Sequence, residues 1–292
     1  MYICKIKNKQ MTDIIELQNI ATQVRRDIVR MTNAVNSGHP GGSLGCTEFM
    51  TALFFDIMEH DPANFTMDGK GTDMFFMSNG HITPVLYSVM ARCGYFPVKE
   101  LNTFRVFGTR LQGHPSTGHG LPGIRMASGS LGQGLSVAIG AAIAKKMDND
   151  NKIVYTLHGD GELEEGQIWE ATMYAGAKGV DNLIATVDCN GQQIDGTTDE
   201  VLSLGDLKNK WEAFGWQVVE IANGNDMQQM IDAFHTAKSL TGKGKPVVIL
   251  MKTEMGYGVD FMQGTNKYHG VAPSNDELER ALSQLKETLG DY

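Results

Sequence analysis

The sequence predicts an α/β fold: a doubly wound, mostly parallel sheet with helices on both faces. Strand-like and helix-like stretches alternate along the chain, and the strand-like runs are apolar at consecutive positions. Runs of that kind are typical of parallel strands that are buried on both sides. Glycine-rich turns follow several of the runs, and ligands of such sheets bind where the strands end. We therefore expect the functional residues in those turns.

The predicted elements follow in chain order. Residues 13–36 carry apolar side chains at helical spacing, and residues 132–147 form a second helix pattern of small residues. Polar breaks at 147–152 and 222–226 separate elements, but neither resembles a linker between domains, and no internal repeat appears. We expect one domain over residues 1–292. The predicted strands are residues 74–78, 152–157, 183–188, 216–221 and 246–251.

Composition limits the partners of the chain. It has 292 residues, is 41% hydrophobic and carries a net charge of −9, so it lacks the basic excess that nucleic acid or an anionic membrane surface would require. We expect neither partner. No 18-residue apolar run and no signal sequence are apparent, which favours a cytoplasmic protein. The cysteines are more than 40 residues apart and are expected to be reduced thiols: Cys4, Cys46, Cys93 and Cys189.

The stretch "LHGDGELEEGQIWEA" (157–171) resembles a phosphate-binding turn but is acidic. Phosphate loops of the Walker type carry a lysine, whereas this turn holds Asp160 between Gly159 and Gly161. A divalent cation between the carboxylate and a diphosphate would explain the acid, because Mg²⁺ is held by oxygen ligands and commonly shares them with phosphates. A helix expected to start near Leu163 would point its amides at the phosphate.

The second metal ligand is expected at the end of the next predicted strand, where Asn190 offers an amide oxygen. A G-D-G turn followed about 30 residues later by Asn is the pattern with which thiamine diphosphate enzymes hold their Mg²⁺-diphosphate. The alternative is structural: Asp160 would cap a helix and Asn190 would form a turn.

Histidines next to glycines form the second group of candidates. Turns carry functional residues more often than packed helix faces do, and a neutral imidazole can bind a sugar hydroxyl or move a proton near neutral pH. The histidines of this kind are His39, His81, His114, His119, His158 and His269.

Together these motifs resemble transketolases. "NSGHPGGSLG", "SNGHITPVLY", "GHPS", "GSLGQGL", "GDGELEEGQIWEA", "DCNGQQIDG" and "YHG" follow in the order of that family's motifs and span nearly the whole chain. The match covers only the N-terminal, diphosphate-binding domain of transketolases, which are roughly twice as long. The chain therefore resembles the N-terminal subunit of a split transketolase.

The resemblance assigns a role to each matching residue. The metal, Mg²⁺ or in its place Ca²⁺ or Mn²⁺, would be held by Asp160, Asn190 and the backbone carbonyl of Gln192. Four histidines would serve catalysis: His39 and His269 near the substrate carbonyl and C3 hydroxyl, His114 near the C1 hydroxyl, and His81 at the diphosphate. The residues expected to contact or border thiamine diphosphate are His81, Gly129, Leu131, Gly159, Asp160, Gly161, Glu165, Asn190, Ile194 and His269. Of these, Glu165 would also lie at the subunit interface.

Some positions depart from the family pattern. Cys189 stands where many relatives have Asn, and it should not change the metal. His158 replaces an aliphatic residue, and we expect it to be a packed side chain unless it reaches the phosphate. Arg125 and Ala127 replace acidic and hydroxyl residues that are common in microbial relatives. These changes concern the substrate, which the sequence does not identify.

The activity that the resemblance implies is transfer of a two-carbon ketol unit from a ketose phosphate to an aldose phosphate, as in the pentose phosphate pathway of carbohydrate metabolism. The glutamate that activates the cofactor belongs to the pyrimidine-binding domain of the family and has no counterpart in this chain. We therefore expect a C-terminal partner subunit, in a heterotetramer.

Two alternatives remain open. One is another thiamine diphosphate enzyme, such as a 1-deoxyxylulose-5-phosphate synthase or a transketolase specialised for an unusual sugar. The other is a non-catalytic paralogue that keeps the fold.

Overall fold

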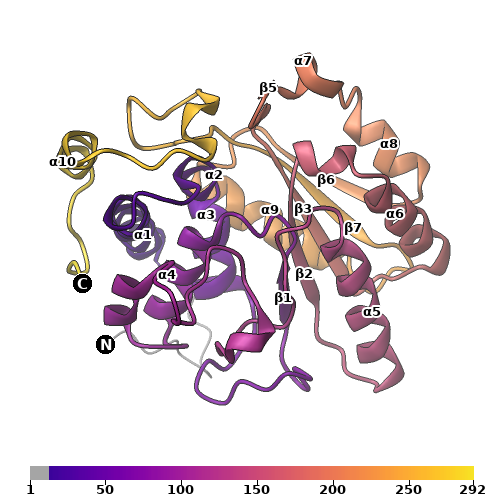
Figure 1. The fold of residues 1–292 in the computed structure, drawn as a ribbon. Coiled ribbons are helices and arrows are strands. Elements are labelled where there is room, and N and C mark those ends of the chain that lie inside the picture. Colours follow the sequence, from indigo (N-terminus) through magenta and orange to yellow (C-terminus); the bar gives the residue numbers. More distant parts are fainter. Residues whose placement is uncertain (1–12) are drawn as a thin grey trace.

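The computed structural model describes residues 13–292, and a five-stranded parallel sheet forms its centre (Figure 1). All four neighbouring strand pairs run parallel, so the carboxyl ends of the strands lie at one edge of the sheet. The predicted α/β fold and each predicted strand are confirmed. In spatial order the strands are β1 (Met74–Met77), β2 (Val154–Gly159), β3 (Leu183–Cys189), β7 (Val247–Lys252) and β6 (Gln217–Ile221).

Successive strand residues point to opposite faces of the sheet, and both faces are buried over β1, β2, β3 and β7. In β7, Val247, Ile249 and Met251 belong to one core, whereas Val248 and Leu250 belong to the core on the other face. This double burial explains why the strands appear in the sequence as continuous apolar runs.

Helices cover the two faces separately (Figure 1). The first core includes residues from α1 (Ile14–Ala34), α3 (Thr47–Ala52), α4 (Thr83–Cys93), α9 (Met227–Leu240) and α10 (Asn275–Gln284). The second core includes residues from α5 (Gly134–Met147), α6 (Gly166–Lys178) and α8 (Leu207–Ala213). The helices predicted at 13–36 and 132–147 are therefore confirmed as α1 and α5.

Shorter elements lie around this framework. They are α2 (Pro40–Gly45), α7 (Thr198–Leu202), the two-stranded antiparallel pair β4 (Gln192–Gln193) and β5 (Gly196–Thr197), the π-helical turn η1 (Leu53–Ile57), and the 3₁₀ turns η2 (Val98–Thr103), η3 (Thr117–His119), η4 (Gly161–Glu164) and η5 (Asn266–His269).

The helix expected to start near Leu163 begins later. A 3₁₀ turn, η4, occupies residues 161–164, and α6 starts at Gly166. The physical reason is the side chain of Asp160, which accepts a hydrogen bond from the Gly161 amide at 2.8 Å and so closes the turn on itself. The expectation that a helix at Leu163 aims its first amides at a phosphate is wrong in this detail.

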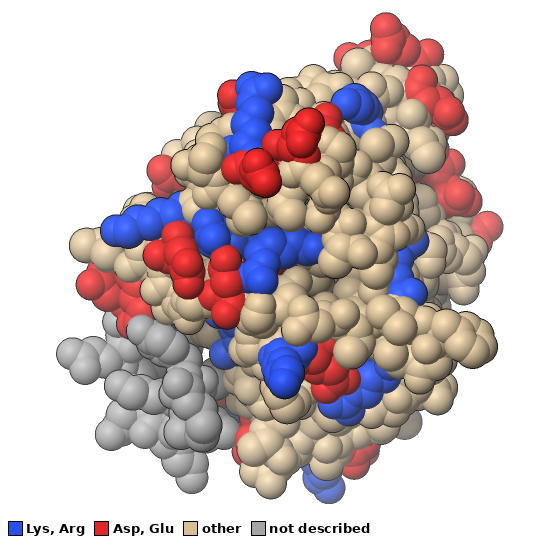
Figure 2. Space-filling model, turned by 60° about the vertical axis from the view of Figure 1, so that its left-hand side comes forward, with Lys and Arg blue, Asp and Glu red and all other residues tan. Residues whose placement is uncertain are grey.

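Cys46, Cys93 and Cys189 are thiols and not disulfides, and Cys4 lies outside the described residues. Over residues 13–292, no helix combines the length and the apolar character needed to span a membrane. On the face drawn in Figure 2, acidic side chains lie directly beside the basic ones.

Candidate functional site

The candidate site is built from turns at the carboxyl ends of three adjacent strands. The segment 78–81 follows β1, the segment 160–161 follows β2, and Asn190 follows β3. Parallel pairing of these strands brings together turns that are about 30 to 80 residues apart in sequence. The turns that the sequence predicts to carry the site therefore lie side by side at one edge of the sheet.

Asp160 joins the second turn to the third. Its carboxylate is only 4% exposed and accepts hydrogen bonds from the Gly161 amide at 2.8 Å and the Gly191 amide at 2.6 Å. Burial and the negative charge of Asp188 raise the pKa of Asp160 to about 7. Two buried carboxylates close together are costly unless positive charge or donors compensate.

Asp188, the next-to-last residue of β3, fixes the orientation of the Asn190 side-chain amide. The Asn190 Nδ2 donates to Asp188 Oδ2 at 2.8 Å, and the Thr253 hydroxyl also donates to Asp188. Burial raises the pKa of Asp188 as well. Because the amide nitrogen is bound to Asp188, the oxygen of Asn190 faces the other way, where it accepts from the Gln192 amide at 2.9 Å.

The donor set fits a hard divalent cation. The Asp160 carboxylate, the Asn190 amide oxygen and the carbonyl of Gln192 are oxygen donors of the type that Mg²⁺, Ca²⁺ and Mn²⁺ bind. Within residues 13–292, no group of three or more His, Cys, Asp or Glu side chains could hold a metal without such help. An ion at this turn would therefore depend on amide, backbone and phosphate oxygens in addition to the one carboxylate.

Four histidines form one cluster. The ring centroid of His39 is 5.0 Å from that of His81, 5.8 Å from that of His269 and 6.4 Å from that of His114, and the His81 and His269 rings stack at 5.1 Å. The sequence places these rings on four separate segments, before α2, after β1, after Gly113 and in η5. Because β4 and α2 both contact η5, the cluster adjoins the loop that carries Gln192.

Burial keeps these imidazoles neutral. It lowers the pKa of His39 to about 4, with the charges of His269, Arg105 and His114 acting in the same direction. It also lowers the pKa of His81, His114 and His269. A neutral imidazole offers one donor and one acceptor, which suits hydroxyl and carbonyl groups of a sugar.

Several buried polar atoms in these turns have no partner in the protein. They include His39 Nδ1, His269 Nδ1, Asn79 Oδ1 and Ser128 Oγ. Buried polar groups are normally hydrogen-bonded, so such a group of unsatisfied atoms along one set of turns is what a site for a polar ligand leaves behind. The residues present therefore fit a phosphorylated cofactor with its cation.

Other predicted residues lie around the cluster. Gly129 has φ +141°, and a Cβ there would lie 2.9 Å from Cδ2 of His114, so this turn requires glycine for both conformation and space. Leu131 is half-buried in the same segment, and Glu165 is exposed, with its Cβ against Gly132. Ile194 is 64% exposed between β4 and β5.

Two of the glycine-flanked histidines are not in the cluster. His119 is exposed on η3. His158 is fully buried, 3.1 Å from the Thr156 hydroxyl and 3.6 Å from a carboxylate oxygen of Glu162. It is a packed side chain, which is one of the two outcomes that the sequence allows for this position.

Glu162 is the residue that sequence reasoning missed. It is buried and accepts hydrogen bonds from the Ser78 hydroxyl, the Gly132 amide at 2.8 Å and the Gly159 amide at 3.1 Å. It therefore ties the turn after β1, the turn after β2 and the segment before α5 together. A carboxylate directly after a G-D-G turn was the available signal, but two neighbouring glutamates, Glu164 and Glu165, make it hard to single out.

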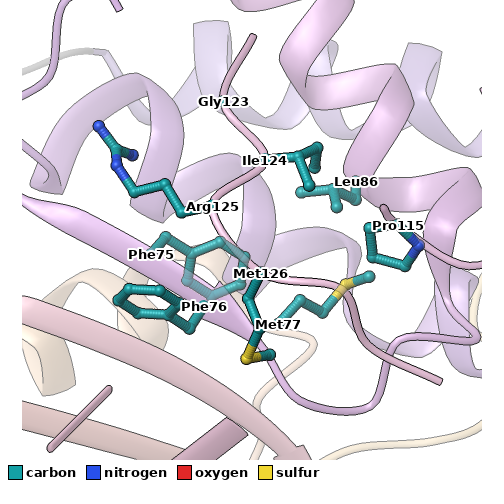
Figure 3. A pocket seen from close by; sticks show the side chains of 9 residues that line it. All are labelled: Phe75, Phe76, Met77, Leu86, Pro115, Gly123, Ile124, Arg125 and Met126. Carbon is teal, nitrogen blue, oxygen red and sulfur yellow. The ribbon is translucent and has the colours of Figure 1, made fainter. Parts of the chain in front are cut away.

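Arg125, which departs from the family pattern, lies beside a small separate pocket (Figure 3). This pocket has a volume of about 20 Å³, enough for about one water molecule. The guanidinium points away from the other labelled side chains, donates to the Thr66 carbonyl at 3.0 Å and lies over the Phe65 ring at 4.4 Å. Ala127 is exposed.

Comparison with known proteins defines the class. Residues 17–290 match the family "Transketolase, thiamine diphosphate binding domain", and the chain belongs to that family. The fold agrees: a transketolase of Pichia stipitis in complex with sedoheptulose-7-phosphate superposes with a TM-score of 0.86 at 31% identity, over 94% of this chain and 41% of that chain. A transketolase of Leishmania mexicana gives 0.85 at 30% identity, over 97% of this chain and 43% of that chain.

Some relatives that match over nearly their full length are named as subunits. The chain is 40% identical to a 6-deoxy-6-sulfo-D-fructose transketolase subunit of Clostridium sp. (strain MSTE9), over 93% of this chain and 97% of the relative. It is 38% identical to one subunit of the apulose-4-phosphate transketolase of Phocaeicola vulgatus, over 95% of both chains. It spans only 41% of Escherichia coli transketolase 2, at 34% identity over 92% of this chain.

Proposed function

We propose that this chain is the thiamine diphosphate- and magnesium-binding subunit of a transketolase. With a second subunit it would transfer a two-carbon ketol unit from a ketose phosphate to an aldose phosphate. The observation that carries the proposal is the cluster of His39, His81, His114 and His269 beside the strand-end turns that hold Asp160 and Asn190.

The residues that would hold the cofactor follow from the strand ends. Asp160, Asn190 and the Gln192 carbonyl would bind the cation, and His81, Gly161 and His269 would border the diphosphate. Gly159 would lie at the same turn, Gly129 and Leu131 beside the pyrimidine ring, and Ile194 and Glu165 at the exposed rim. When bound, thiamine diphosphate supplies the electron sink that ketol transfer requires.

The histidines of this chain would act on the sugar. Since burial holds them neutral near pH 7, His39 and His269 can each accept a proton from a hydroxyl and donate a hydrogen bond to a carbonyl oxygen. In this assignment they serve the C3 hydroxyl and the carbonyl, and His114 binds the C1 hydroxyl. Their arrangement around one space would orient the ketose before bond cleavage.

The sugar itself is a second question. Two relatives that match over nearly their full length are named for 6-deoxy-6-sulfo-D-fructose and apulose-4-phosphate, which favours a specialised sugar over the substrates of the pentose phosphate pathway. A reaction of the 1-deoxyxylulose-5-phosphate synthase type is a weaker candidate, because the "SGHPGG" and "GHPS" turns follow transketolases. A non-catalytic paralogue would have no need of four clustered neutral histidines.

A partner chain completes the proposal. Three relatives that match over nearly their full length carry the word subunit in their names, and single-chain transketolases are more than twice as long as the stretch that this chain matches. We expect the partner to supply the pyrimidine-binding domain with its glutamate, in a cytoplasmic heterotetramer with two sites.

The test combines binding and activity. The chain is produced together with the product of a neighbouring pyrimidine-domain reading frame, and thiamine diphosphate binding is titrated by calorimetry with and without Mg²⁺. Ketol transfer is then assayed with fructose 6-phosphate, 6-deoxy-6-sulfo-D-fructose and apulose 4-phosphate as donors. Transfer from one of them supports the function and names the sugar class. Cofactor binding without transfer from any donor favours the non-catalytic paralogue, and no Mg²⁺-dependent binding refutes the assignment.

A further inference from the structure

Arg105 is a basic side chain beside the histidine cluster that no acid neutralises. It follows η2 on the segment that leads to His114, and no carboxylate within residues 13–292 forms an ion pair with it. Its Nε is buried without a hydrogen-bond partner. Burial lowers the pKa of the guanidinium, but arginine stays charged near neutral pH.

The guanidinium contacts the two turns that carry His39 and His114. Its Nη1 donates to the Ser37 hydroxyl at 2.9 Å, two residues before His39. On the other side, Gly113 lies so close that a Cβ there would be 2.7 Å from the Arg105 Cζ. A side chain at 113 would therefore displace the guanidinium, whereas the φ of Gly113 itself lies outside the left-handed region and does not call for glycine.

The backbone of Arg105 shows that its position is imposed. Its φ is +56°, in the left-handed region that residues other than glycine rarely adopt. The Arg105 amide donates to the Leu111 carbonyl at 2.7 Å, which closes the 105–111 loop and brings the side chain back toward Gly113. The surrounding structure thus holds this residue in a strained conformation, and the result is a fixed guanidinium.

The charge of Arg105 acts on the same two rings. The groups that lower the pKa of His39 besides burial are His269, Arg105 and His114, and the only charged side chain that lowers the pKa of His114 is Arg105. His81 lies 5.0 Å from His39 and is itself neutral. No carboxylate is among the groups that shift either ring, so the positive charge is not offset.

We propose that Arg105 is a positioning residue for His39 and His114: it holds their two turns in register and presents a fixed positive charge to both rings. It reaches the substrate only through these histidines. The inference rests on the proposed function only for what the histidines do to a sugar, because the contacts and the charge belong to the chain itself.

The experiment follows the histidine rings by NMR titration in the full chain, which needs neither cofactor nor turnover. Arg105→Met removes the charge and the contacts, and Arg105→Lys keeps the charge but loses the planar fork. Arg110→Met is the matched control, because Arg110 lies in the same loop, is paired with Glu100 and is absent from the groups that shift His39 or His114. We expect the pKa of His39 and His114 to rise in Arg105→Met, to stay nearly unchanged in Arg105→Lys, and to be unaffected in Arg110→Met.

Activity of the assembled enzyme gives the second readout. We expect kcat to fall about tenfold or more in both Arg105 variants, with little change in KM, because displaced histidines lose orientation rather than binding area. Only Arg105→Met should also move the acidic limb of the pH profile upward. Gly113→Ala, which displaces the guanidinium while leaving it in the chain, should reproduce the loss of kcat and carries the test if Arg105→Met does not fold.

The outcomes separate the two proposals. Unchanged histidine titration in folded Arg105→Met, or full kcat in Gly113→Ala, overturns the role of Arg105 even if ketol transfer is confirmed. A shifted titration in a protein without ketol transfer supports the role of Arg105 and refutes the proposed function.

Discussion

Asp160 and Glu162 are two residues apart in one acidic turn, but the structure gives them different tasks. Asp160 lies at the strand end with Asp188 beneath it, and we predict that Asp160→Ala abolishes Mg²⁺-dependent thiamine diphosphate binding by the assembled protein, because the cation loses its one carboxylate. Titration calorimetry measures this. Asp232→Ala, an exposed acid on α9, is the control and should bind normally. Wild-type affinity in Asp160→Ala would contradict the metal assignment.

Glu162 is not a suitable control for that experiment. Its carboxylate accepts hydrogen bonds from Ser78, Gly132 and Gly159 in the buried interior. Removing it would leave these buried donors without partners, which costs stability. A loss of cofactor binding in Glu162→Ala would therefore report on the turns and not on the metal.

The histidines are tested at the same scale. We predict that His39→Ala and His114→Ala each lower ketol transfer by roughly 10²-fold while cofactor binding stays nearly intact, as expected for groups that transfer protons or bind the reacting sugar. Steady-state kinetics on the assembled enzyme checks this.

The control for these variants is His235→Ala, an exposed residue on α9. His60 is unsuitable as a control, because it is buried and hydrogen-bonded to the Tyr95 hydroxyl and the Phe54 carbonyl. Unchanged turnover in both glycine-turn variants would remove these two histidines from the site.

The low pKa of His39 also predicts a pH-dependent stability. Its pKa is about 4 in the folded chain and near 6.5 when exposed, so between these values the unfolded state binds more protons. This contribution to the free energy of unfolding is fully present above pH 6.5 and is lost as pH falls toward 4. Denaturant titrations of wild type and His39→Gln should show a stability difference that shrinks over this window. A difference independent of pH would contradict the burial of a neutral ring.

At the scale of elements, two helical glycines make opposite predictions. Gly176 in α6 lies against the loop after α8, where a Cβ would be 1.8 Å from the Phe214 carbonyl oxygen. Gly176→Ala should therefore lower the free energy of unfolding by about 1–3 kcal/mol, since a backbone atom must move. Gly140 in α5 is exposed with nothing within 4 Å, and Gly140→Ala should stabilise by about 0.5–1 kcal/mol. Thermal melts that rank the two in the reverse order would disprove the packing argument.

The strands and long helices were predictable because the pattern of apolar residues within each segment is enough to identify it. A strand such as β7 is apolar at consecutive positions, and α1 repeats apolar residues at helical spacing. Each pattern can be recognised without knowing the rest of the structure. The start of α6 was not predictable in the same way. It depends on which backbone amide donates a hydrogen bond to the Asp160 side chain. A side chain that bonds to its own turn leaves no periodic pattern in the sequence.

The candidate site was predictable as a set of turns, but not as a network. Strand ends indicated Asp160 and Asn190, and neighbouring glycines indicated the histidines. Contacts between distant segments, such as that of Ser78 with Glu162 and that of Arg105 with Ser37, leave no local pattern in the sequence. The first of these contacts depends on the strand order β1-β2-β3 and the second on how the loops before α2 and after η2 pack together, and the sequence states neither.

At the scale of the whole molecule, the face formed by α5 and α6 carries several exposed apolar side chains. The outward stripe of α5 holds Val137, Gly140, Ala144 and Met147 without a charge, and Met173 and Tyr174 are exposed on the neighbouring helix α6. A groove of about 480 Å³ lies at the C-terminal ends of these two helices, where Lys146 and Lys178 line it beside Ile143, Met147 and Tyr174. Exposed apolar patches of this kind mark interfaces. Because Glu165 at the start of α6 touches Gly132 before α5, this face adjoins the candidate site.

We predict that the α5–α6 face binds the pyrimidine-binding subunit, and that ketol transfer appears only in the mixture. The isolated chain should be inactive even with saturating Mg²⁺ and thiamine diphosphate, because it lacks the glutamate that activates the cofactor. Mixing with the partner should give a heterotetramer by chromatography with light scattering. Met173→Asp should prevent assembly and activity together, since a charge would be buried. Ile15→Asp is the matched control: Ile15 is 65% exposed and Met173 57%, but Ile15 lies on α1, which covers the opposite face of the sheet. Full activity of the isolated chain, or equal assembly of the two variants, would refute the split-site proposal.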